Sequence, residues 1–175
     1  MENEVLRNIK TRRSCRAYTA QPVEPEKLKA ILEAGTWAAS GHGWQAAKIV
    51  VLQDAAEIAE LERMNAAVLG NPDGHPFYGA PVVCVVLTDP ERYTCVEDGS
   101  LVMGNLMLAA HSLGVASCWI HRAREEFDSP EGKELLRTLG IKGDYEGIGN
   151  LIVGYPDGEI PEAKPRREGR VFYAK

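Results

Sequence analysis

Two short basic windows, one near each end of the chain, carry the residue types best suited to bind an anion. The windows are KTRRSCR and KPRREGR, and together they hold Lys10, Arg12, Arg13, Arg16, Lys164, Arg166, Arg167 and Arg170. Guanidinium groups pair with phosphate oxygens in bidentate fashion, and a hydroxyl such as that of Ser14 adds a donor. Because chain termini often lie close together in a domain, the windows predict a shared anion clamp. Two solvated ends are the simpler alternative.

A glycine pattern, GHGWQA from Gly41 to Ala46, fits the G-x-G-x-x-G/A fingerprint of dinucleotide-binding proteins. That fingerprint works only where a strand runs into a glycine turn that opens a helix. Here the order is reversed, because Pro25–Trp37 has the spacing of a helix and Lys48–Leu52 that of a strand. The pattern therefore argues against a Rossmann site, and the loop requires another explanation.

Metal and protein-based catalytic chemistry have no clear candidates in the sequence. The four histidines, His42, His75, His111 and His121, lack the spacing of metal ligands. The four cysteines form no C-x-x-C motif and favour free thiols in a reducing compartment. No nucleophile or acid/base pair stands out. His111 lies in an apolar segment and is interpreted as a core or interface histidine.

Composition places the chain among ordinary globular proteins. Its 175 residues are enough for one domain, residues 1–175, with a sizeable core. The formal net charge of −5 argues against nucleic acid as a partner. No apolar run is long enough to span a bilayer, and no signal-peptide pattern opens the chain. We therefore expect a cytoplasmic protein without a membrane partner.

The hydrophobic pattern predicts an α+β fold, with one sheet flanked by helices. Helices are expected at 2–10, 25–38, 55–69, 97–113 and 130–139, and strands at 48–52, 82–87, 115–120 and 148–153. The segment RVFY near the C-terminus is a further candidate for an edge strand. The segment 97–113 is apolar on almost every side, which is typical of a helix buried all round. A domain of this size encloses such a helix with difficulty, so the pattern predicts a homodimer.

Four segments, in this order, resemble the nitroreductase family of FMN-dependent oxidoreductases. They are RRSCRAY (12–18), AASGHGWQ (38–45), DGSLVMGNLMLAAHSLGVASCWI (98–120) and GYPDGEIPEAKPRRE (154–168). The resemblance covers residues 4–173. It implies a nitroreductase-like domain with a central, mainly antiparallel sheet and a long buried helix at a homodimer interface.

The resemblance also implies where FMN binds. The phosphate site matches Arg12, Arg13, Ser14, Arg16, Lys164 and Arg166. The loop of one subunit lies on the flavin held by the other, and the matching positions are Ala39, Ser40, Gly41 and Gln45. The strand that passes the ring contributes Cys118, Trp119 and Ile120. The flavin site thus lies at the subunit interface.

The implied activity is ping-pong transfer of electrons from NADH or NADPH, through FMN, to a small-molecule acceptor such as a nitroaromatic or a quinone. His42 and Trp44 are candidates to contact the substrate over the ring, although Trp44 fits simple loop packing equally well. The family's Asn is Gly43 here, and its Pro-Trp is Ala46-Ala47.

Three alternatives stay open at this point. The first is an FMN-binding storage or sensor module with little turnover. The second is a relative that performs dehalogenation or flavin breakdown on the same scaffold. The third is an interaction domain without flavin.

Overall fold

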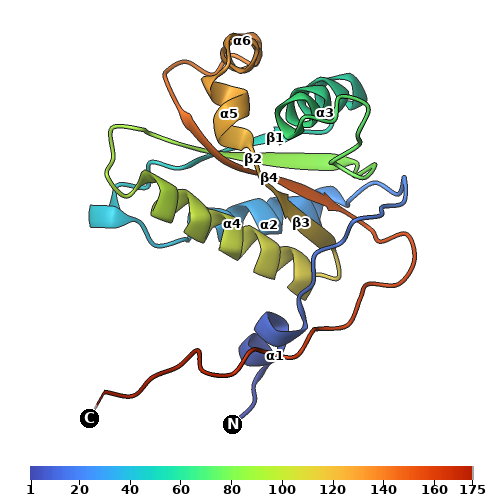
Figure 1. The fold of residues 1–175 in the computed structure, drawn as a ribbon, viewed down its shortest axis with the longest axis vertical. Helices are drawn as coiled ribbons and strands as arrows, with labels where there is room; N and C mark the ends of the chain where they lie inside the picture. The colour runs from blue at the N-terminus through green and yellow to red at the C-terminus, as the bar shows by residue number, and fades with distance from the viewer. Residues whose placement is uncertain (175) are drawn as a thin grey trace.

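The computed structural model describes residues 1–174 and has three layers, with helices on both faces of a sheet (Figure 1). The sheet has the order β1–β2–β4–β3, and every neighbouring pair is antiparallel. Its strands are β1 (Lys48–Leu52), β2 (Val82–Thr88), β3 (Ala116–Ile120) and β4 (Glu146–Gly154). The α+β architecture with an antiparallel sheet confirms the prediction.

Some of the helices begin where the sequence offers a capping side chain. The helices are α1 (Glu4–Thr11), α2 (Pro25–Thr36), α3 (Ala55–Leu69), α4 (Cys95–Ser112), α5 (Ala123–Asp128) and α6 (Pro130–Thr138), and a short 3-10 turn, η1, spans Gly41–Gly43. Asp54 accepts hydrogen bonds from the first turn of α3, and Ser129 accepts one from Gly132 in α6. A side-chain oxygen at this position satisfies amide groups that the helix itself leaves unpaired.

Two apolar cores lie on the two faces of the sheet. One joins the sheet to α3, α5 and α6, and the other joins it to α2 and α4 (Figure 1). Every residue of β2 is buried, which explains its unbroken apolar sequence. In Cys84 of this strand, burial raises the pKa of the thiol to about 12. That thiol therefore serves as a small core side chain.

The structure departs from the predicted elements at several positions, among them β4, which begins at Glu146 rather than 148, and α1, which begins at Glu4 rather than 2. Helix α5 was not expected, because its six residues are too few to show a helical period. Helix α4 begins two residues earlier than expected, at Cys95. The prediction of a strand at RVFY is wrong, because residues 170–173 form no strand and are exposed. Among the described residues no neighbouring strand lies beside them to provide hydrogen bonds.

The long helix α4 is not enclosed on all sides. Its inner face is buried against the sheet, but Leu101 is 50% exposed, and Gly104 and Leu108 on the same outer stripe are half-buried. The predicted all-round burial of α4 is therefore absent within one chain.

The described residues contain no helix long and apolar enough to cross a membrane.

Backbone hydrogen bonds join the segment that follows α1 to β3 and to the segment that follows β4. Thr19 donates its backbone N–H to Tyr155 and Asp157 donates to Ala17, both at 2.9 Å. Cys15 donates its backbone N–H to Ser117 of β3 at 3.1 Å. These bonds fix the first basic window between β3 and the start of the C-terminal segment.

Candidate functional site

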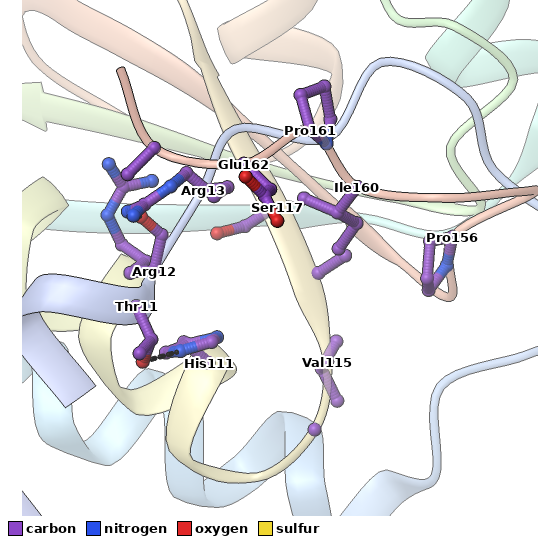
Figure 2. Close-up of a pocket in the computed structure, with 13 residues that line it drawn as sticks. Thr11, Arg12, Arg13, His111, Val115, Ser117, Pro156, Ile160, Pro161 and Glu162 are labelled. Carbon is purple, nitrogen blue, oxygen red and sulfur yellow. Dashed lines mark hydrogen bonds between the residues drawn. The ribbon is translucent and has the colours of Figure 1, made fainter. Parts of the chain in front are cut away.

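A cavity of about 640 Å³ lies beside the first basic window, near the end of α4 (Figure 2). Arg12 and Arg13 enter it from the segment after α1, and Ser117 enters it from β3. The C-terminal segment forms another wall with Ile160 and Glu162. Residues that are far apart in the sequence thus surround one space.

The two arginines that line the cavity carry hydrogen-bond donors that have no partner within the described residues. Nη1 of Arg12 and Nε of Arg13 are both buried and unpaired within the described residues. Another guanidinium nitrogen of Arg13, Nη1, donates to the carbonyl of Arg12. Leaving a buried charged donor unpaired is costly, so the arrangement favours an anionic ligand with several acceptor oxygens. A phosphate has this chemistry.

The other predicted phosphate residues do not line this cavity. Ser14 is half-buried and forms an isolated bridge with Ser117, but it does not line the cavity. Arg16 is exposed outside the cavity, and so are Lys164 and Arg166. The C-terminal segment does approach the first window, as the shared clamp requires, but its charged contribution to the cavity is the carboxylate of Glu162.

The glycine loop lies at the opposite end of α4. The backbone N–H of Gly41 donates to Oδ1 of Asp98 at 2.9 Å, and Asp98 also accepts a hydrogen bond from Thr94 at 3.2 Å. A Cβ atom on Gly41 would lie 2.4 Å from Oγ1 of Thr94. Gly41 is therefore needed for close approach to α4 in this chain.

The remainder of the loop is also held by internal bonds. The Ser40 hydroxyl accepts the backbone N–H of Gln45 at 3.0 Å. His42 and Gln45 have positive φ angles of 52° and 50°, and Gly43 has 68°. Non-glycine residues adopt this conformation at a cost, which these contacts must offset. Ala39, Ser40 and Gln45 line a second cavity of about 1030 Å³ along α2 and β1.

An exposed aromatic cluster stands on this loop. His42 and Trp44 stack with ring centroids 4.9 Å apart, and Nε2 of His42 lies 2.7 Å from the Tyr93 hydroxyl. The guanidinium of Arg92 lies 4.7 Å from the centroid of the Trp44 ring. The cation lies over the face of the Trp44 ring, and exposed aromatic rings of this kind can pack against a planar molecule.

The predicted ring-contact residues of β3 alternate between the two cores. Cys118 and Ile120 face the core of α3, α5 and α6 and are buried, whereas Trp119 packs in the other core. A Cβ atom on Gly149 would lie 2.3 Å from Nε1 of Trp119. Cys118 and Ile120 could therefore contact a ligand only through main-chain groups.

A buried polar network lies just beyond β3. The carboxylate of Glu126 accepts hydrogen bonds from Asn65 and from Asn150, the latter at 2.7 Å. The Asn65 side chain also accepts two bonds from Arg122, at 3.0 and 2.8 Å. Burial raises the pKa of Glu126 to about 7, although its hydrogen bonds and the charge of Arg122 act in the opposite direction.

Several residues of these sites were not among the sequence candidates, including Ser117, His111, Asp98, Tyr93 and Arg92. Asp98 gave no distinctive signal, because acidic residues are common in the first turn of a helix. The described residues contain no group of three side chains suited to hold a metal ion.

Comparison with known proteins gives consistent matches. The model of the nitroreductase family matches residues 9–80 and 73–155. A crystal structure of a Bacteroides fragilis nitroreductase with bound FMN superposes with a TM-score of 0.91 and 31% identity, over 99% of this chain and 100% of that chain. An Archaeoglobus fulgidus protein provisionally named NADH dehydrogenase/NAD(P)H nitroreductase is 32% identical over 89% of this chain and 87% of its own. The FMN reductase (NAD(P)H) of Bacillus subtilis is 26% identical over 94% of this chain and 70% of its own.

Proposed function

The chain belongs to the nitroreductase family, and we propose that it is an FMN-dependent oxidoreductase. It takes electrons from NADH or NADPH and passes them to an organic acceptor of the nitroaromatic or quinone type. The names of its relatives support both FMN and a nicotinamide donor.

The observation that carries this proposal is that Arg12 and Arg13 line one cavity and each has a guanidinium nitrogen without a partner within the described residues. Arg12 and Arg13 offer buried donors to an anion, and Ser117 is close enough to share the same space. The phosphate of FMN carries a charge of about −1.5 to −2 and three acceptor oxygens, which fits this donor set. The residues present therefore fit FMN at its phosphate end.

The chemistry that FMN supplies when bound is two-electron transfer at its ring. The chain's own residues bind and orient the reactants. Arg12 and Arg13 would hold the phosphate, and main-chain groups of β3 would be available to the ring. His42 and Trp44, with Tyr93 beside them, offer exposed aromatic rings against which a planar acceptor packs. No protein acid, base or nucleophile is needed for this sequence of events.

The site requires a second copy of the chain. The loop is bound to Asp98 and the cavity is lined by His111, which are separated along α4 by about 20 Å at 1.5 Å per residue. If two copies pack α4 against α4 about a twofold axis, the loop of each lies toward the cavity of the other. The exposed stripe of Leu101, Gly104 and Leu108 supports this packing.

The homodimer is tested by placing a charge on this stripe. Leu101→Glu should give monomers in sedimentation velocity and weaken FMN retention, because it puts a carboxylate in an apolar interface. The matched control is Leu69→Glu on α3, where the side chain is 48% exposed. A dimeric, FMN-loaded Leu101→Glu protein would contradict the packing.

The activity is tested by the visible spectrum of the purified protein before and after anaerobic addition of NADH or NADPH. We expect a flavin spectrum that bleaches, and the more effective nucleotide identifies the donor. A flavin spectrum unchanged by either nucleotide would favour an FMN-binding module. No flavin spectrum, even after FMN is added, would overturn the proposal.

A further inference from the structure

His111 lines the same cavity as Arg12 and Arg13, from the last turn of α4 (Figure 2). Its Nε2 atom lies 2.8 Å from the hydroxyl of Thr11. That hydroxyl has one proton, which it donates to the carbonyl of Arg7, also at 2.8 Å. The hydroxyl oxygen must therefore accept a hydrogen bond from His111, so the neutral imidazole carries its proton on Nε2. Nδ1 is then the nitrogen that can gain a proton.

The surroundings of His111 disfavour the charged form of its imidazole. Burial, followed by the positive charges of Arg12 and Arg13, lowers its pKa below the ordinary value. The charged side chains that line the cavity, among residues 1–174, are Arg12, Arg13 and Glu162. Because the two guanidiniums have unpaired donors, their charge is not cancelled by a partner at those atoms.

We propose that His111 is a third cationic group of this phosphate site, and that its Nδ1 takes up a proton when a phosphate monoester dianion binds beside Arg12 and Arg13. The inference rests on the proposed function, which supplies FMN as the ester. A dianion offsets the positive charge that opposes the imidazolium, and it attracts the new charge directly. The carbonyl end of α4 also favours a cation.

Proton uptake makes the affinity for FMN depend on pH in a defined direction. Binding takes up a proton between the lowered pKa of the free protein and the raised pKa of the complex. His111 therefore makes the affinity fall as the pH rises through this window. The second ionisation of the phosphate, near pH 6, acts in the opposite direction. That ionisation belongs to the ligand, so a variant without the imidazole isolates the contribution of His111.

The test is calorimetric titration of the full chain with FMN, in buffers of different ionisation enthalpy, between about pH 5.5 and 8.5, where imidazole titrates. We expect greater proton uptake by the wild type than by His111→Gln. At the acidic end the wild type should bind FMN more tightly than His111→Gln, by about tenfold for each unit by which binding raises the pKa of His111. This ratio should approach one at the alkaline end.

Controls separate this role from a structural one. His75→Gln, an exposed histidine outside the cavity, should take up protons like the wild type. Riboflavin, which lacks the phosphate, should show no difference between wild type and His111→Gln. If His111→Gln fails to fold, His111→Asn takes its place.

The possible failures are distinct. Equal proton uptake by wild type and His111→Gln at every pH would overturn the role of His111 while leaving FMN binding intact. If the wild type binds no FMN at any pH, the proposed function itself fails.

Discussion

The two ends of α4 carry the two parts of the candidate site, and they differ in how their polar groups are satisfied. At the C-terminal end, Arg12 and Arg13 bring buried donors that have no partner within the described residues. At the N-terminal end, Asp98 accepts from Gly41 and Thr94, and Ser40 accepts from Gln45. One end is therefore prepared for an external charge, whereas the other is closed on itself.

This difference indicates how each end responds to mutation. Removing a donor whose partner is a ligand should weaken ligand binding and leave the folded state largely unaffected. Removing a member of a satisfied internal network should leave a buried group unpaired and lower the free energy of unfolding. The Glu126 network, in which the carboxylate accepts from Asn65 and Asn150 and which shares no residue with the cavity lining, belongs to the second class.

The largest expected effect is on folding, at Glu126. The pKa of its carboxyl rises on folding from 4.5 to about 7, so the folded state holds the proton more tightly than the unfolded state. The wild type should therefore lose stability as the pH rises through this window, by on the order of 3 kcal/mol. Glu126→Gln cannot ionise and should lack this loss. Urea unfolding of both proteins at several pH values checks it, and parallel pH curves would contradict it.

The next effect is on ligand affinity, at Arg12. Arg12→Ala should weaken FMN binding by roughly 1.5–3 kcal/mol, the worth of a charged hydrogen bond, and leave the unfolding midpoint of the FMN-free protein near that of the wild type. Equilibrium dialysis and urea unfolding provide the two measurements. Arg137→Ala, which removes a surface arginine paired with Glu134, is the control and should change neither. A large loss of stability in Arg12→Ala would remove the contrast between the two ends.

Asp98 should show the reverse pattern. Asp98→Ala leaves the backbone N–H of Gly41 without its acceptor and should lower the free energy of unfolding by about 1–3 kcal/mol. The phosphate cavity at the other end of α4 should stay intact in each chain. Hydrogen exchange at the Gly41 amide, followed by NMR, measures the release of the loop directly. Unchanged protection of this amide would show that Asp98 does not hold the loop.

The smallest expected effect lies in the aromatic cluster. Trp44→Ala removes an exposed stacking partner of Arg92, a contact of about 0.5–1 kcal/mol in such settings. The unfolding free energy should change by no more than this. The KM for a nitroaromatic acceptor should rise if Trp44 contacts the substrate, whereas an unchanged KM would reduce its role to loop packing. Trp37→Ala, at an exposed tryptophan outside the cluster, is the matched control.

The elements of the fold were largely predictable because their signals are local. Pro25 and the Ser129-Pro130 pair mark helix starts, and the apolar run of β2 marks a buried strand. Helix α5 gave no such signal, since six residues cannot display a period. The strand proposed at RVFY failed because a strand depends on a neighbour, and local composition cannot supply one.

The candidate site was predictable only in part. Arginines in a cluster indicated an anion, and the structure does place Arg12 and Arg13 in one cavity. Which basic residues enter that cavity depends on the path of an extended segment, so the positions of Lys164 and Glu162 could not be inferred. The role proposed for His111 could not be predicted from its apolar helix, because it depends on Thr11 and on two arginines that lie about a hundred positions away in the sequence.

The cross-links between Ala17 and Asp157 and between Thr19 and Tyr155 have a mechanical consequence. The two paired segments run antiparallel, and both chain ends leave from the side of Ala17 and Asp157. A force that pulls the termini apart would act on these bonds one at a time, first on the bond between Ala17 and Asp157 and then on the bond between Thr19 and Tyr155. The walls of the anion cavity would thus separate at low tension, before the strands of the sheet begin to slide.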